Sequence, residues 1–220
     1  MTSLISIKAL IQKEFKLEFR NKVSISSMLL YVVSTIFICY QSFKKISDVP
    51  VWNALLWIII LFSAINAVNK SFYSENKNQQ MYFYLLTSPE NIIVAKILYN
   101  IILVNALALV SYFIYSLILG NPGDFPWQLW LVIVLGATGM SSILTLVSAI
   151  AAKTNNNLGL VSILAFPVMV PLIITIVKAG KNASDLIAFS ANAKYIVVMG
   201  GLDVLIIALA FILFPYLWRE

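Results

Sequence analysis

The stretch NKSFYSENKNQQMYFYLLTSPENIIVAK, residues 69–96, is the longest polar interruption in a chain that is otherwise almost continuously apolar. Two apolar runs precede it and four follow it. Its amides and charges would lack partners in hydrocarbon, so the stretch must lie outside a bilayer. Met81, Tyr82, Leu85 and Leu86 recur in it at helical spacing, which predicts a short helix that docks a partner protein.

The composition places the whole chain in the membrane class. Of its 220 residues 61% are hydrophobic and 11% are charged, whereas soluble domains hold about 45–50% apolar and about 25% charged residues. The length corresponds to one domain. We therefore predict an all-α, polytopic membrane protein that forms a single domain over residues 1–220.

Residue counts also exclude several kinds of chemistry. The net charge of +6 fits basic residues that flank membrane spans better than it fits a nucleic-acid site. The chain has no histidine and one cysteine, Cys39, which removes the usual general base and the usual metal ligands and excludes an intramolecular disulfide. It also lacks a P-loop. We predict a non-enzymatic chain that binds no cofactor or metal of its own and cannot hydrolyse ATP by itself.

Six apolar runs predict membrane-spanning helices, at residues 23–40, 52–68, 89–119, 127–152, 158–177 and 195–218. Residues 1–22 are amphipathic and predict a helix in the membrane interface. Ser88, Pro89 and Glu90 read as the N-cap, first position and first turn of the third span. The loop 69–90 before it is predicted to hold the docking helix. Lys96 should lie near the membrane surface and extend its charge outward.

Basic residues predict the orientation. With the N-terminus inside, ten Lys and Arg residues lie on the inner side (8, 13, 16, 20, 22, 70, 77, 96, 153 and 219) and five on the outer side (44, 45, 178, 181 and 194). This bias favours cytoplasmic termini and a cytoplasmic loop 69–90. Residues 178–194 are expected to form the longest outer loop, with a short interfacial helix around 183–189.

Some residues within the spans have more than one interpretation. Pro167 and Pro171 should kink or break the fifth span, as packing features or as a hinge. Small residues recur every four positions along the fourth span and predict a helix-packing ridge, with a dimer seam as the alternative: Ala137, Ser141, Thr145 and Ala149. Asp203 is either a carboxylate near the outer surface, if Gly200 and Gly201 break the helix, or a polar site in a pathway. Three asparagines in apolar surroundings either form interhelical hydrogen bonds or contact a substrate: Asn66, Asn100 and Asn105.

Several short motifs occur in an order that resembles a known family. They are Phe15-x-x-Glu18-x-Arg20, Leu85-Leu86-Thr87-Ser88-Pro89-Glu90 with Ala95-Lys96, Leu135-Gly136, and Ser162-Ile163-Leu164-x-x-Pro167-x-x-x-Pro171-Leu172. Together with six spans they resemble, over nearly the whole chain, the haem-exporter permeases of cytochrome c maturation, CcmB.

The resemblance implies the membrane subunit of an ABC transporter in the bacterial inner membrane. Such a subunit would pair with a second copy of itself and with two copies of an ATPase that binds the ATP. A tryptophan-rich, haem-handling membrane subunit and a periplasmic haem chaperone would complete the complex, whose action releases the haem-loaded chaperone. Haem would be handled by the complex rather than bound by this chain, because Trp127 and Trp130 are isolated and histidine is absent.

The same resemblance assigns roles to the loop. Met81, Tyr82, Leu85 and Leu86 would enter a groove of the ATPase, and Glu75 and Lys77 would add polar contacts. Two other functions remain open from the sequence. One is a six-span ABC permease that exports another substrate, such as a lipid or a drug, and the other is a membrane scaffold without transport.

Overall fold

The computed structural model describes residues 2–69, 71–72, 87–121, 127–153 and 158–219, and these form seven α-helices without a strand. The helices are α1 (Thr2–Arg20), α2 (Lys22–Phe43), α3 (Val49–Val68), α5 (Pro89–Leu119), α6 (Trp127–Lys153), α7 (Leu158–Ser184) and α8 (Phe189–Arg219). All except α1 are long and apolar enough to cross a membrane. The predicted all-α, six-span architecture is therefore confirmed.

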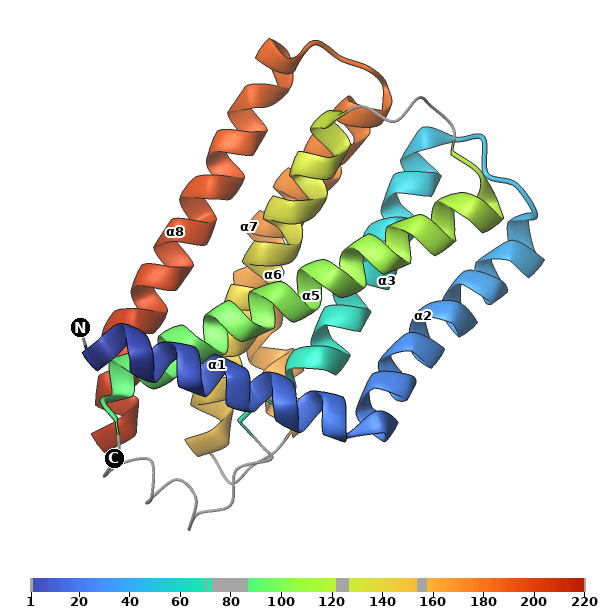
Figure 1. Ribbon diagram of the computed structural model, residues 1–220. Helices are drawn as coiled ribbons and strands as arrows, with labels where there is room; N and C mark the ends of the chain where they lie inside the picture. Colours follow the sequence, from blue (N-terminus) through green and yellow to red (C-terminus); the bar gives the residue numbers. More distant parts are fainter. Residues whose placement is uncertain (1, 70, 73–86, 122–126, 154–157, 220) are drawn as a thin grey trace.

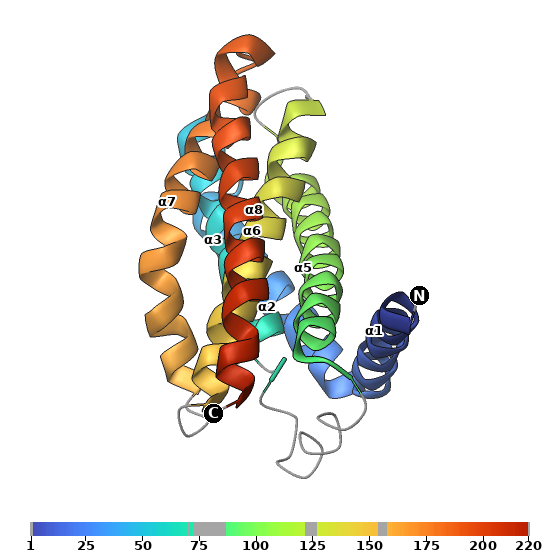
Figure 2. The same cartoon turned by 90° about the vertical axis from the view of Figure 1, so that its left-hand side faces the viewer.

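The six spanning helices form one bundle, and successive helices run in alternating directions (Figure 1). One end carries α1, the end of α3, the start of α5 and the end of α8; we call it the loop end. The ends of α2, α5 and α7 and the starts of α3, α6 and α8 lie at the opposite end, the turn end. Figure 2 shows α1 beside the lower part of α5, at the edge of the loop end.

Helix α6 is the most buried of the six spanning helices and contacts α3, α5, α7 and α8, so it forms the centre of the bundle. Its large apolar side chains, such as Ile133 and Met140, are buried. Helix α2 lies at the periphery and exposes Leu30, Phe37 and Ile38. Apolar side chains on an outer surface fit lipid as the surrounding solvent, where association depends on close packing rather than on the hydrophobic effect.

The turn end differs from the sequence-based expectation. We expected an outer loop over 178–194, but α7 continues to Ser184 and α8 begins at Phe189, so the connection is short. Buried amides hold these helix ends together. Asn53 Nδ2 donates to Val177 O (2.9 Å), Asn192 Nδ2 to Ala179 O (3.1 Å) and Gln128 Nε2 to Ile187 O (3.2 Å). The prediction of a loop with a separate helix was wrong because tertiary hydrogen bonds support polar helix ends.

Neither of two expected helix breaks occurs, while the alternative of a kink at the prolines stays a prediction. Helix α7 is continuous through Pro167 and Pro171, and helix α8 is continuous through Gly200 and Gly201. Both prolines are exposed on the outer face of α7, so their rings do not disturb the packed face. In lipid a helix also keeps its backbone hydrogen-bonded, which opposes a break at glycine. Whether the prolines act as a hinge stays a prediction.

Candidate functional site

The predicted docking residues, Glu75, Lys77, Met81, Tyr82, Leu85 and Leu86, lie outside the described residues. The structure does describe both flanks of their segment. Ser71 and Phe72 follow α3 on one side, and Thr87 and Ser88 precede α5 on the other. The candidate site is therefore built from the contacts that attach these two flanks to the bundle.

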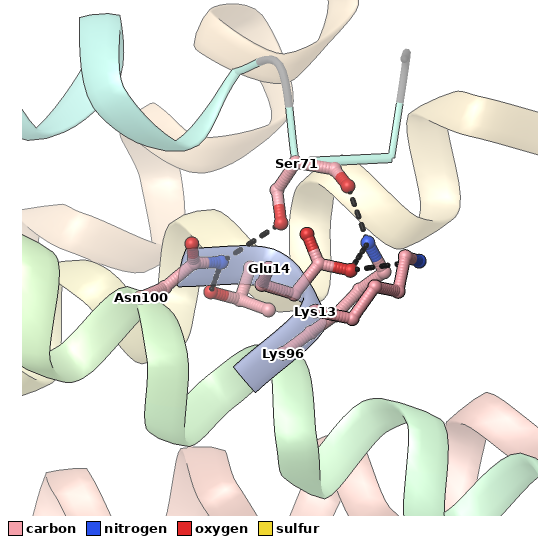
Figure 3. Close-up of polar contacts among 6 residues, drawn as sticks. Lys13, Glu14, Ser71, Lys96 and Asn100 are labelled. Atoms are coloured by element: carbon pink, nitrogen blue, oxygen red, sulfur yellow. Dashed lines mark hydrogen bonds and ion pairs between the residues drawn. The ribbon is translucent and has the colours of Figure 1, made fainter. Parts of the chain in front are cut away.

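The first flank is bound to α5 and α8. Lys96 Nζ donates to the carbonyl oxygen of Ser71, and Asn100 Nδ2 donates to Ser71 Oγ at 3.0 Å (Figure 3). The Phe72 side chain is buried, and its ring centroid lies 5.8 Å from that of Phe214 on α8. The chain leaving α3 is thus fixed to two other helices ahead of the predicted docking residues.

Lys96 is the centre of this cluster. It is only 2% exposed, and its Nζ lies 3.5 Å from Glu14 Oε1 on α1 and 4.6 Å from the centroid of the Phe72 ring. Lys13 Nζ approaches the same Glu14 oxygen at 3.1 Å. A buried ammonium needs such partners, because desolvating an unpaired charge costs several kcal/mol. The expectation that Lys96 extends toward the membrane surface was wrong, since its charge is neutralised inside the protein.

Asn100 extends the cluster to the central helix. Its Nδ2 also donates to Thr145 Oγ1 at 2.9 Å, and Thr145 Oγ1 donates to Ser141 O of its own helix at 2.7 Å. Asn105 makes a second bond between α5 and α6, from Nδ2 to Thr138 Oγ1 at 3.1 Å. Interhelical hydrogen bonding is therefore confirmed for Asn100 and Asn105, whereas Asn66 is exposed on α3.

The second flank leads directly into α5. Ser88 has an extended backbone, and its carbonyl oxygen accepts from the amides of Asn91 (3.1 Å) and Ile92 (3.3 Å). Pro89 takes the first helical position and Glu90 lies in the first turn. The Ser88 side chain makes no capping hydrogen bond, so its backbone alone marks the helix start. This flank shares one rigid helix with Lys96 and Asn100.

The predicted packing ridge lies inside the bundle. All four of its residues are buried by other helices of the same chain: Ala137, Ser141 and Thr145 are fully buried, and Ala149 is 3% exposed. Trp57 packs just beside the ridge, and a Cβ on Gly136 would lie 2.7 Å from its ring. The small residues of α6 therefore allow neighbouring helices to approach it closely, as is typical of helix packing in lipid.

Sequence reasoning overlooked Glu14 and Ser71 as partners of Lys96. A partial signal was present, because Lys96 and Asn100 are four residues apart on one helix face. Their partners lie 82, 25 and 45 residues away in the sequence, which no local pattern indicates. Among the described residues no group of three His, Cys, Asp or Glu side chains could hold a metal ion.

The bundle and its polar cluster define a multi-pass helical membrane protein whose largest polar segment is attached to the bundle on both sides. The chain belongs to the CcmB family, since the family model described as CcmB protein matches residues 5–216. This is the family of haem-exporter permeases of the ABC type in cytochrome c biogenesis, which are transport components that work with an ATPase partner. No curated protein matches the chain.

Proposed function

We propose that this chain is the permease subunit that receives the energy of ATP hydrolysis through segment 69–90. The attachment of both flanks supports this role. Ser71 and Phe72 contact α5 and α8, and Pro89 begins α5 itself. A force on the segment would thus reach α5 from two directions, and would pass to α6 through Asn100.

The loop end would then face the cytoplasm of a bacterium, with the protein in the inner membrane and both termini on the cytoplasmic side. Ten of the fifteen basic residues fall on this side when the spans alternate. Basic residues are retained on the cytoplasmic side of membrane proteins. This orientation brings segment 69–90 to the side where ATP is available.

The proposed complex contains two copies of this chain and two ATPase subunits. Met81, Tyr82, Leu85 and Leu86 would fill an ATPase groove, with Glu75 and Lys77 in polar contact. A tryptophan-rich membrane subunit would handle haem and pass it to a periplasmic chaperone, because this chain has no histidine to ligate iron. ATP-driven movement of the two bundles would release the loaded chaperone.

The observation that carries the proposal is the attachment of Ser71 to Lys96 and Asn100. The proposed docking role is tested by combining Tyr82→Ala with Leu86→Ala in the full complex. We expect normal membrane insertion but loss of ATPase stimulation and of cytochrome c maturation. Tyr84→Ala removes an aromatic ring outside the Met81/Leu85 spacing and serves as the matched control. Unchanged complex assembly and maturation in the double variant would refute the docking role.

A further inference from the structure

A single carboxyl group lies at the middle of the bundle. Asp203 of α8 is 5% exposed. At 1.5 Å per residue it lies about 21 Å along α8 from Phe189 and about 24 Å from Arg219. It is therefore far from both ends of its helix, at a depth where hydrocarbon surrounds a spanning bundle.

The surroundings of Asp203 come from the middle of two other helices. Its Oδ1 lies against Gly139 of α6, so closely that a Cβ there would overlap it, and Leu172 of α7 lies 2.7 Å from that same Cβ position. Neither carboxyl oxygen has a hydrogen-bond partner in the described part of the chain. The group thus occupies a tight junction of α6, α7 and α8 without the polar contacts that the amides at both bundle ends possess.

No charged group of the described residues compensates this carboxyl. The nearest on α7 is Lys178, six residues beyond Leu172, and α6 has none before its last residue, Lys153. The remaining titratable side chains of the helices packed against this region are Glu90, Lys96, Tyr99, Tyr112 and Tyr115 on α5, Lys181 on α7, and Lys194, Tyr195, Tyr216 and Arg219 on α8. A carboxylate anion here would be desolvated without a partner, whereas a neutral carboxylic acid fits the site.

We propose that Asp203 is a proton-binding site that links the packing of α6, α7 and α8 to pH. While the helices are packed, Asp203 holds a proton; when α8 moves away from α6 and water enters, the proton passes to that water. When the helices pack again, Asp203 takes a proton back from bulk water, and no other group changes its protonation state. Gly139 makes the packed state accessible, because only a residue without a side chain admits Oδ1 at that position. This inference does not depend on the ATPase coupling proposed above.

The test measures the separation of α6 and α8 in the full-length chain in lipid nanodiscs. Spin labels are attached at Val134→Cys and Val197→Cys, two exposed positions, in a Cys39→Ala background, and their distance distribution is recorded across a pH series. We expect the separated population to rise with pH, by at most about tenfold per pH unit for one proton. Asp203→Asn should stay packed at every pH. Asp185→Asn, the same change in the exposed α7–α8 turn, should respond like the parent.

A second variant tests the contact between Gly139 and Asp203 by changing the residue on α6. Gly139→Ala should favour the separated state at every pH, because its methyl group takes the space of Oδ1. If Asp203→Asn does not fold, Asp203→Leu carries the same expectation of a pH-independent packed state. The proposal is overturned if the parent and Asp203→Asn respond alike to pH. It is also overturned if the separation follows sodium or potassium concentration at constant pH, which would indicate a metal-cation site.

Discussion

Lys96 and Asp203 are both buried ionisable residues within spanning helices, yet their environments are opposite. The Lys96 ammonium has a carbonyl oxygen, a carboxylate and an aromatic ring around it, contributed by α1 and the segment after α3. The Asp203 carboxyl has a glycine and a leucine beside it and no hydrogen-bond partner in the described residues. One site surrounds its charge with partners, and the other provides none among the described residues.

The difference indicates what each site can do. A fully partnered charge resists change, so Lys96 suits a fixed joint between segments that must move together. An unpartnered group responds to its surroundings, since water or a proton alters its energy by a large amount. Stability measurements on matched variants can sharpen or refute this contrast.

The largest effect is expected from Lys96→Met. The change removes the ammonium that donates to Ser71 O and that pairs with Glu14, so we expect a loss of about 3–5 kcal/mol. Thermal unfolding in detergent micelles measures it. Lys8→Met, the same substitution at an exposed position of α1, is the control. Equal stability of the two variants would show that Lys96 is not a structural joint.

Gly139→Ala should have the next largest effect. Its methyl group would overlap Asp203 Oδ1 and Leu172, and overpacking of this kind costs about 1–3 kcal/mol. Gly200→Ala is the control, because a Cβ there meets nothing within 4 Å. The control should be neutral or slightly stabilised, since alanine favours a helix more than glycine does. A stabilised Gly139→Ala variant would mean that the junction is not tight.

Thr145→Val should cost less. The substitution keeps the side-chain shape but removes the acceptor for Asn100 Nδ2, and an interhelical hydrogen bond in a membrane protein contributes about 0.6 kcal/mol. Thr35→Val removes only a bond to Tyr31 O of the same helix and serves as the comparison. A larger loss at Thr35 than at Thr145 would contradict the role of Asn100 as a link between α5 and α6.

The smallest effect is expected from Asp203→Asn. If the buried side chain is already neutral, asparagine replaces one uncharged polar group with another of similar size, so the free energy of unfolding should change little at neutral pH. The unfolding measurement used for Lys96→Met applies here too. A loss as large as that of Lys96→Met would mean that Asp203 is ionised and paired, which would erase the contrast between the two sites.

Much of the fold could be predicted from the sequence. Helix α5 begins at Pro89 and ends at Leu119, as expected from Ser88-Pro89-Glu90 and from the extent of the apolar run. The turn end was predicted poorly, because Lys178, Lys181 and Asn182 are polar and resemble a loop. They remain helical in the structure, where Asn182 Nδ2 also reaches Asn192 Oδ1 at 3.4 Å.

The site was less predictable than the fold. The predicted docking residues could be named from their spacing, and they lie outside the described residues. Lys96 and Asn100 could be seen as polar groups in an apolar helix, but their partners on α1, α6 and the segment after α3 could not. A lysine near a span end has two ways to satisfy its charge, toward water or toward a carboxylate, and local sequence does not distinguish them.

The sequence by itself determined six spanning helices, because about 20 apolar residues in lipid can satisfy their backbone only as a helix. It also predicts that the polar segment 69–90 lies outside the hydrocarbon, because its amides and charges would lack partners there. Only the tertiary structure decided which polar side chains are satisfied. Lys96 meets Glu14 from 82 residues away, while Asp203 lies against Gly139 and has no hydrogen-bond partner among the described residues. The physical reason is that side-chain pairing depends on which helix faces meet, and packing of the whole bundle sets those faces.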